Sequence, residues 1–242
     1  RPGAERRLLA TAALLAALAE RVESLAEAVR LLSLGPERIL AFAYADTLLR
    51  LHLPFADRDL IQRHILRDGT FYEARQLADI RPMIRPGAVV VDAGANIGNH
   101  TLFFAAVCGA AMVHAIEPGR VARSILECNI ALNGLEERVR VHPFALGAEP
   151  GAAEFRRYPA GNIGAATLEQ DPTGRYPVAA LDSLRLGRVD FVKMDVEGGF
   201  LDALRGAAET LRRFRPPVWI ELRRKLGEVE PGERALSELG YR

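Results

Sequence analysis

Cysteine is scarce in this sequence, with two residues among 242, Cys108 and Cys128. Small secreted domains that depend on disulfides carry several cysteines at regular spacing, and that pattern is absent. The scarcity excludes a disulfide-stapled fold and favours a reducing compartment, so we expect a cytoplasmic protein. A disordered chain is excluded as well, because 49% of the residues are hydrophobic and can form a core.

Long apolar runs are also missing. The uncharged apolar run near the start, from Leu8 to Ala19, has 12 residues, whereas a helix needs about 20 to cross a bilayer. A basic start followed by an apolar run is typical of a signal peptide, but here the apolar periodicity continues through charged residues to Leu32. We therefore expect neither a membrane span nor a cleaved leader.

Charge of one sign is not in excess either. The 32 lysines and arginines balance 31 aspartates and glutamates, which leaves a net charge of +1. Domains that bind nucleic acid usually present a strong basic field, and this balance does not supply one. We therefore expect no nucleic acid partner. Lysine itself is nearly absent, since Lys193 and Lys225 are the only two.

An apolar stripe runs through the first 32 residues, with a step of three or four positions. This spacing predicts one long helix, ended by Gly35-Pro36 because proline cannot continue a helix. Two interpretations remain open: the helix pairs with a second copy of the chain in a homodimer, or it lies on its own domain. The stripe consists of Leu8, Thr11, Leu15, Leu18, Val22, Leu25, Val29 and Leu32.

The chain is expected to divide into an N-terminal helix (residues 1–35), a small unit of short strands and helices (residues 36–85) and a larger catalytic unit (residues 86–242). In the larger unit, short apolar runs alternate with helical stretches, which is typical of a parallel sheet covered by helices on both faces. The predicted fold is therefore α/β, Rossmann-like and doubly wound, with a mostly parallel sheet. The expected strands are 88–91, 112–116, 139–144, 189–194 and 218–222.

A glycine-bearing turn, Asp92-Ala93-Gly94-Ala95-Asn96-Ile97-Gly98, follows the first of these strands. Open α/β sheets bind ligands at this place, and N–H groups at the start of the next helix attract a carboxylate. A dinucleotide-binding loop would have glycine where Asn96 stands, and the acid at Asp92 disfavours a pyrophosphate. Asp92 favours a ligand with an amino group, so an amino acid moiety meets both demands.

The second strand ends in Glu117-Pro118, 23 residues after Gly94. An acid at this place accepts hydrogen bonds from the two hydroxyls of a ribose. Amino acid and ribose together indicate S-adenosylmethionine. After the third strand, the small side chain of Ala145 either leaves room for the adenine or belongs to a plain turn. The residues expected to bind this cofactor are Asp92, Gly94, Ala95, Asn96, Gly98, Asn99, Glu117, Pro118, Ala145 and Asp195.

These motifs resemble the FkbM-type S-adenosylmethionine-dependent methyltransferases over about residues 57–222. The resemblance implies a class I methyltransferase that acts on a hydroxyl oxygen, often of a sugar in a glycan or of a polyketide. It rests on the turn with Asn99-His100-Thr101, on Glu117-Pro118, Asn129 with Asn133, Asn162-Ile163-Gly164, Leu181-Asp182, Lys193-Met194-Asp195-Val196-Glu197-Gly198 and Glu221.

The chain departs from the family pattern at two places. Phe200 stands where an acid is usual. After Glu221, few residues remain for the reversed hairpin that completes such a sheet. This second departure predicts a sheet that is truncated at its far edge or lacks that edge.

Methyl transfer to oxygen requires removal of the acceptor proton and alignment of the oxygen, so a general base is expected at the rim of the sheet. We assign Glu197 to the base and Asp195 to the methionine end, because Glu197 reaches farther from the strand; Asp195 suits base catalysis about equally well. His100 is another candidate, since imidazole ordinarily titrates near about pH 6.5, although packing beside the cofactor is the simpler interpretation. Glu221 is better suited to bind acceptor hydroxyls.

No metal is expected, because no histidine or cysteine spacing indicates zinc and a site of Asp195, Glu197 and Glu221 lacks further oxygen ligands. The stretch from Glu149 to Gly161 is predicted to be an irregular loop that positions an acceptor together with Asn162-Ile163-Gly164. Two other functions stay open. One is a binding or assembly protein with the same fold and no turnover, motivated by Phe200 and the short C-terminus. The other is a nicotinamide-dependent oxidoreductase, which the glycine turn disfavours.

Overall fold

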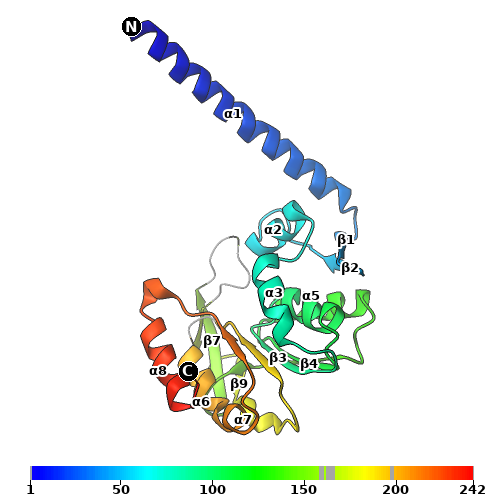
Figure 1. Ribbon diagram of the computed structural model, residues 1–242, viewed down its shortest axis with the longest axis vertical. Helices are drawn as coiled ribbons and strands as arrows, with labels where there is room; N and C mark the ends of the chain where they lie inside the picture. Colours follow the sequence, from blue (N-terminus) through cyan, green and yellow to red (C-terminus); the bar gives the residue numbers. More distant parts are fainter. Residues whose placement is uncertain (1, 158–160, 162–166, 197–198, 242) are drawn as a thin grey trace.

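A computed structural model describes residues 2–157, 161, 167–196 and 199–241 of the chain. One helix, α1 (Pro2–Ser33), projects from a body that holds the other labelled elements (Figure 1). Near its base, α1 contacts helix α2 (Leu60–Asp68), where Arg63 Nε lies 2.8 Å from Glu27 Oε1. The predicted N-terminal helix is confirmed. In the part of the chain that the structure describes, we find no helix with both the length and the apolar character of a membrane span.

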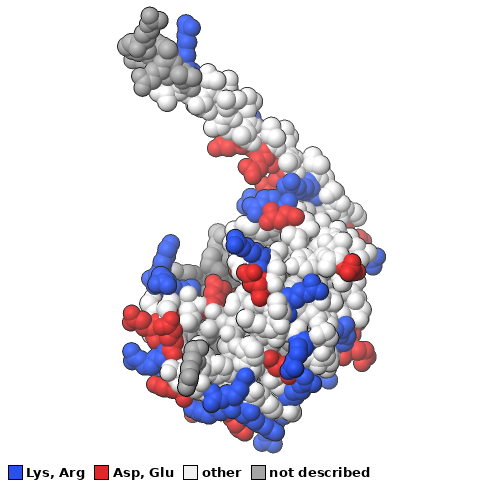
Figure 2. All heavy atoms as spheres, viewed as in Figure 1, with Lys and Arg blue, Asp and Glu red and all other residues white. Residues whose placement is uncertain are grey.

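The apolar stripe of α1 is not covered by the body. The exposed fractions of its large apolar side chains range from 48% at Leu18 to 80% at Leu32. Figure 2 shows the middle of this helix as an uncharged surface that faces solvent. The interpretation in which the helix lies on its own domain is therefore wrong, because α1 meets the body only near its base.

Residues 36–85 form an antiparallel hairpin of β1 (Ile39–Tyr44) and β2 (Thr47–His52), followed by α2, α3 (Ala74–Ile80) and a 3₁₀ turn, η1 (Arg81–Met83). Two asparagines attach β2 to helix α5 (Arg120–Leu132). Asn129 Oδ1 accepts from the His52 N–H at 2.6 Å, and the Asn133 amide bonds both the N–H and the carbonyl of Arg50. The hairpin is thereby fixed to the larger unit.

The central sheet is parallel throughout, in the order β11-β10-β3-β4-β5. This confirms the predicted α/β fold class, and the strands begin or end within three residues of their expected bounds. Strand β11 forms one edge of the described sheet. The strands are β3 (Val89–Ala93), β4 (Met112–Ile116), β5 (Val139–His142), β10 (Phe191–Met194) and β11 (Val218–Ile220).

Two hydrophobic clusters cover the two faces of this sheet, because neighbouring side chains of a strand point to opposite faces. Val90 belongs to a cluster that includes the hairpin, α2, α3 and α5, whereas Val91 belongs to a cluster with the C-terminal helices. Residues 36–85 therefore share their core with the central sheet. The remaining helical elements are α4 (Asn99–Leu102), the π-helix η2 (Phe103–Val107), η4 (Leu181–Leu184), α6 (Phe200–Gly206), α7 (Ala208–Phe214), η5 (Arg224–Leu226) and α8 (Val229–Glu238).

A second sheet lies beside the first, in the order β6-β9-β7-β8. Its strands are β6 (Ala145–Leu146), β7 (Gly151–Arg157), β8 (Thr167–Gln170) and β9 (Tyr176–Ala179). The prediction of an irregular loop from Glu149 to Gly161 is therefore wrong for its larger part. Its glycines, proline and alanines hid a strand that pairs with β8 and β9, which follow it in the chain.

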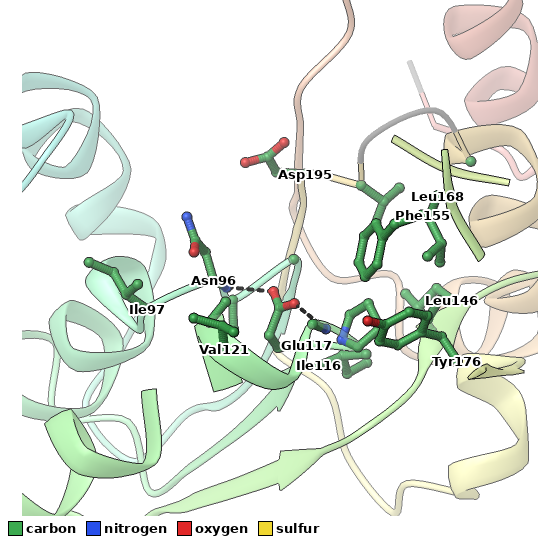
Figure 3. A pocket seen from close by; sticks show the side chains of 18 of the residues that line it. Asn96, Ile97, Ile116, Glu117, Val121, Leu146, Phe155, Leu168, Tyr176 and Asp195 are labelled. Carbon is green, nitrogen blue, oxygen red and sulfur yellow. Dashed lines mark hydrogen bonds between the residues drawn. The ribbon is translucent and has the colours of Figure 1, made fainter. Parts of the chain in front are cut away.

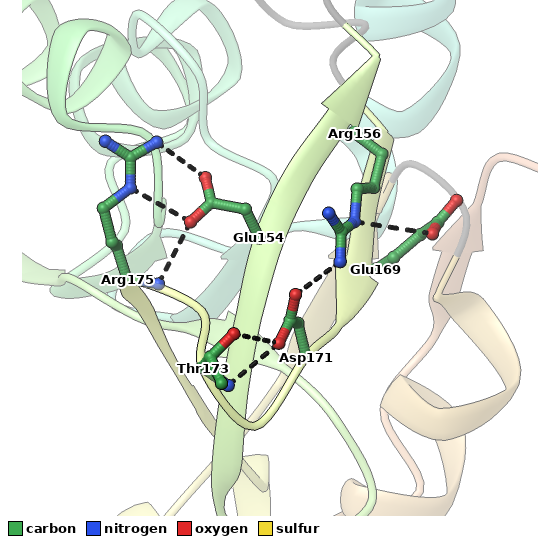
Figure 4. Close-up of polar contacts among 6 residues, drawn as sticks. All are labelled: Glu154, Arg156, Glu169, Asp171, Thr173 and Arg175. Atoms are coloured by element: carbon green, nitrogen blue, oxygen red, sulfur yellow. Dashed lines mark hydrogen bonds and ion pairs between the residues drawn. The ribbon is translucent and has the colours of Figure 1, made fainter.

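Ion pairs cover one face of this second sheet (Figure 4). Arg175 holds Glu154 through two hydrogen bonds of 3.0 and 2.8 Å, and Arg156 pairs with Asp171. The Arg175 side chain holds the pKa of Glu154 at about 2. These arginines are largely exposed, so this face of the sheet is in contact with water.

Candidate active site

A cavity of about 780 Å³ opens at the carboxyl ends of β3, β4 and β10, where the turn after β3 was expected to bind a ligand (Figure 3). The ends of these strands line one side. The second sheet lines another side, and residues between β2 and α3 complete the wall. The volume of the cavity is large enough for a molecule of the size of a cofactor.

Two glycines allow the turn after β3 to pass close to its neighbours. Gly94 and Gly98 have φ angles of 75° and 92°, which side chains rarely adopt. A Cβ atom on Gly94 would lie 1.8 Å from the Asp195 carbonyl oxygen, and one on Gly98 would lie 2.7 Å from Leu126 Cδ1. Both glycines are therefore required by packing within the protein.

Backbone N–H groups of this turn bind the second strand. The N–H groups of Gly94 and Ala95 donate to the Ile116 carbonyl at 3.0 and 3.1 Å, and the Asn96 N–H donates to Glu117 Oε2 at 2.9 Å. These three donors are consequently committed within the protein. The Asn96 side chain points into the cavity, and its buried Oδ1 has no hydrogen-bond partner among the described residues (Figure 3).

Asp92 lies behind the cavity and not in its lining as described. It is fully buried; its Oδ2 accepts from the Thr101 hydroxyl at 2.5 Å, and its Oδ1 lies 3.4 Å from Lys193 Nζ. Lys193 also donates to the Gly94 carbonyl at 2.8 Å and lies 3.5 Å from Asp195 Oδ2. Burial alone would lower the pKa of Lys193, but Asp92 and Asp195 outweigh it and raise that pKa above its ordinary value.

Glu117 stands at the end of β4, beside the cavity, with 8% of its surface exposed. Its two carboxylate oxygens accept from the N–H groups of Asn96 and Gly119 at 2.9 and 2.7 Å. Burial raises the pKa of Glu117 to about 7, although these two hydrogen bonds oppose the rise. Pro118 lines the cavity next to it.

The end of the cavity near the second sheet is largely apolar, although Glu169 and Gln170 of β8 also line it. Ile116 ends β4, Val121 lies on α5 and Ala145 begins β6, and the rest of the second sheet adds aromatic and aliphatic side chains. The rings of Phe155 and Tyr176 meet edge to face at 4.6 Å. Sequence reasoning did not find these second-sheet residues, because the small residues of β7 weaken its alternation and β9 has none. They are Leu146, Ala153, Phe155, Leu168, Tyr176 and Val178.

The opposite end of the cavity is polar and acidic. Asp195 and Glu221, both predicted, line it together with Tyr72 and Glu73, which the sequence analysis missed. Burial raises the pKa of Tyr72, and the nearby charges of Glu73, Glu221 and Asp195 raise it further. His100 is 8% exposed and also lines this end. No local pattern marks Glu73, because only the tertiary fold brings it to the cavity.

The structure places two further positions that the sequence analysis singled out. The Asn99 side chain is bonded to the backbone of Tyr72, through Tyr72 N–H to Oδ1 at 2.9 Å and Nδ2 to the Tyr72 carbonyl at 3.0 Å. Phe200, the departure from the family pattern, is buried in the hydrophobic cluster of α6. Glu197 lies outside the described residues, as does Asn162-Ile163-Gly164. A search of the described residues finds no group of histidine, cysteine, aspartate and glutamate side chains that could hold a metal ion.

Comparison with known proteins gives a family match over most of the chain. The model of the methyltransferase FkbM domain matches residues 92–242. The chain is also similar to Methyltransferase 1 of Beauveria bassiana (strain ARSEF 2860), with 26% identity over 178 residues that cover 63% of this chain and 71% of that protein.

Among solved structures, a methyltransferase FkbM from Methylobacillus flagellatus KT is 25% identical, with a TM-score of 0.42. The match covers 55% of this chain and 32% of that one, so the chain spans about a third of that protein's length. A precorrin 8w decarboxylase from Methanobacterium thermoautotrophicum is 19% identical, with a TM-score of 0.45 and coverage of 70% and 72%.

Proposed function

The chain belongs to the FkbM methyltransferase family, whose methyl donor is S-adenosylmethionine, and from this premise we propose that it methylates a hydroxyl oxygen of a sugar, glycan or polyketide-like acceptor. The observation that carries the proposal is the division of one cavity into an apolar end and an acidic end, with Glu117 beside it. Such a cavity suits a ligand that has a flat aromatic base at one end and a charged amino acid at the other.

The donor set fits S-adenosylmethionine at three places. The apolar end between Val121, Leu146 and Tyr176 accommodates the adenine ring. Glu117 keeps further lone pairs for the ribose hydroxyls, since each of its oxygens accepts one backbone hydrogen bond from the neighbouring turns. The unpartnered Oδ1 of Asn96 and the Asp195 carboxylate suit the ammonium of the methionine end.

Asp92 supports this arrangement from behind. Because it is buried against Lys193, and Lys193 holds both the Gly94 carbonyl and the Asp195 carboxylate, the pair fixes the groups that meet the cofactor. We therefore propose that Asp92 acts on cofactor binding through Lys193. This differs from the direct contact with the ammonium that its place after the strand suggested.

The acidic end is the proposed acceptor site. Tyr72, Glu73, His100, Asp195 and Glu221 line it. Carboxylates accept hydrogen bonds from hydroxyl donors, whereas they repel anionic acceptors. A neutral, hydroxyl-rich acceptor therefore suits this end best. Asp195, Glu197, Glu221 and His100 remain the groups proposed for binding the acceptor or removing its proton.

We propose further that α1 pairs with α1 of a second copy, since its apolar stripe keeps the heptad spacing and faces solvent.

The two cysteines are both free, and burial raises the pKa of the Cys108 thiol to about 11, which makes it unreactive. Free thiols of this kind support a reducing compartment such as the cytoplasm.

The experiment that tests the function has two stages. Calorimetry with S-adenosylmethionine measures binding to the full chain. Release of S-adenosylhomocysteine is then measured with free hexoses, methyl glycosides, lipid-linked oligosaccharides and hydroxylated macrolactones. Binding with turnover on one class supports the proposal. Absence of binding would overturn the assignment of the cavity, and binding without turnover on any class would favour the non-catalytic alternative.

A further inference from the structure

Two neighbouring pairs of residues are joined at the acidic end of the cavity. Tyr72 and Glu73 precede α3, while Asn99 and His100 begin α4. The Asn99 side chain accepts from the Tyr72 N–H and donates to the Tyr72 carbonyl. His100 Nε2 lies 3.3 Å from Glu73 Oε2. The two segments are therefore held together at two adjacent positions, although they are separated by 27 residues in the chain.

Glu73 adopts a backbone conformation that glutamate rarely has. Its φ of 58° and ψ of 33° lie in the left-handed region, which is unfavourable for a side chain with a Cβ atom. Such a conformation persists only where the surroundings impose it. Here the Asn99 bonds hold the preceding residue, and the Leu77 N–H donates to the Glu73 carbonyl at 2.9 Å. The backbone is thus fixed on both sides of Glu73.

The ring of His100 is fixed as well. Phe104 stacks on it with the ring centroids 6.3 Å apart, and Trp219 meets it edge to face with the centroids 5.2 Å apart. The Nε2 atom is buried and lies 3.3 Å from Glu73 Oε2, and it makes no hydrogen bond within the described residues. No hydrogen bond to Nδ1 is found in the described part of the chain. Since His100 also lines the cavity, one nitrogen is directed to a carboxylate and the other is left for a ligand.

We propose that Glu73 is a positioning residue that keeps the proton of His100 on Nε2, so that Nδ1 accepts the proton of the acceptor hydroxyl. This inference rests on the proposed function and extends it by a residue that the sequence did not indicate. A negative charge 3.3 Å from Nε2 favours the tautomer that carries its proton there, and it stabilises the imidazolium that forms. Tyr72, Asp195 and Glu221 face the same end of the cavity and contribute to its field.

The proposed step balances in protons and electrons. S-adenosylmethionine supplies the methyl group. A lone pair of the acceptor oxygen forms the new C–O bond. The bond between the methyl carbon and sulfur breaks, and its electron pair stays on sulfur. The hydroxyl proton moves to His100 Nδ1, which gives an imidazolium beside the Glu73 carboxylate. Loss of this proton to solvent restores the neutral ring.

The tautomer of His100 can be read without turnover by ¹⁵N NMR of the full chain, free of cofactor and acceptor. The chain has five histidines, and the His100→Gln variant identifies the signals of this ring. We expect Nε2 protonated and Nδ1 bare in the wild type, and a mixture of tautomers in Glu73→Gln. Circular dichroism verifies that each variant is folded. A mixture of tautomers in the wild type would overturn the positioning role.

Kinetics with the acceptor class found active supply the second readout. We expect kcat to fall about 10²–10⁴-fold in His100→Gln, as for loss of a general base, and by about tenfold to a hundredfold in Glu73→Gln. Glu73→Asp keeps a carboxylate and should retain more activity. S-adenosylmethionine affinity should be unchanged in all three, and Glu127→Gln, on the exposed face of α5, is the matched control.

The outcomes separate this inference from the function itself. A wild-type chain without methyl transfer on any acceptor would overturn both. An active wild type in which His100→Gln and Glu73→Gln keep their kcat, while Glu197→Gln loses it, would overturn the inference alone and return the base to Glu197.

Discussion

The rim of the central sheet and helix α1 differ in which side chains they bury: the rim buries charged side chains, whereas α1 exposes apolar ones. At the rim, Asp92 and Lys193 are buried, with at most 3% of each exposed. On α1, large apolar side chains such as Leu25 and Leu32 face solvent. At these two places charge is buried and apolar surface is exposed, the reverse of the usual distribution.

The difference shows what each region requires. Buried charges persist only when they are paired, and at the rim each charge has a defined partner across β3, β10 and the glycine turn. The rim is therefore complete within the chain. Helix α1 lacks such partners along most of its length, and the proposed pairing with a second copy would cover its heptad stripe.

The largest expected effect comes from removing the buried cation. Lys193→Met leaves Asp92 buried without its counter-charge, and we expect the free energy of unfolding to fall by about 3–5 kcal/mol. Urea unfolding measures this change. Lys225→Met is the control, since the only other lysine is exposed on η5. Equal effects of the two substitutions would show that the rim does not depend on this ion pair.

A pH-dependent effect is expected at Glu117. Its pKa of about 7 lies above the ordinary 4.5, so between these values the unfolded chain loses a proton that the folded chain keeps. Stability conferred by this group is full below about pH 4.5 and falls by up to about 3 kcal/mol as the pH rises to about 7. Comparison with Glu117→Gln by urea unfolding at several pH values isolates this loss.

Glu154→Gln provides the contrast for this prediction. The pKa of Glu154 is held at about 2, so its contribution to stability is lost only as the pH falls below its ordinary range. The difference between wild type and Glu154→Gln should therefore be flat from about pH 5 to 7. A flat difference for Glu117→Gln over the same range would contradict the buried state of Glu117.

Cofactor affinity should depend on Glu117 to a smaller extent. Glu117→Ala removes the proposed acceptor of the ribose hydroxyls, and we expect S-adenosylmethionine binding to weaken by about 1.5–3 kcal/mol per hydrogen bond lost. Calorimetry measures the change, with Glu127→Ala on the exposed face of α5 as the control. Unchanged affinity in Glu117→Ala would refute the ribose assignment.

The smallest effect on stability is expected on α1. Leu18→Glu and Leu25→Glu place charges in the proposed pairing stripe, so light scattering should show a change from dimer to monomer. The free energy of unfolding of the body should change by no more than about 0.5 kcal/mol, as for other surface substitutions. Leu48→Glu, an equally exposed leucine on β2, should leave the mass unchanged. A wild-type monomer would contradict the pairing.

The sequence by itself determined the elements whose pattern is local. The stripe of α1, the apolar strands of the central sheet and the glycine turn were all predicted and confirmed, because helix and strand periodicity and turn chemistry are written in adjacent residues. The same is true of the family, since its motifs lie at the ends of these strands. The strand β7 was missed because its many small residues weaken the alternation of apolar and polar positions.

Only the tertiary structure decided the contacts between distant segments. Asp92 was assigned to a ligand from its place after a strand, yet Lys193, about 100 positions later, is its neighbour across the sheet. Glu73 carries no local signal, and it reaches His100 because Asn99 holds Tyr72. Pairings of this kind depend on the order of the strands in the sheet and on the way residues 36–85 pack against it. Neither is encoded in the periodicity of a single segment.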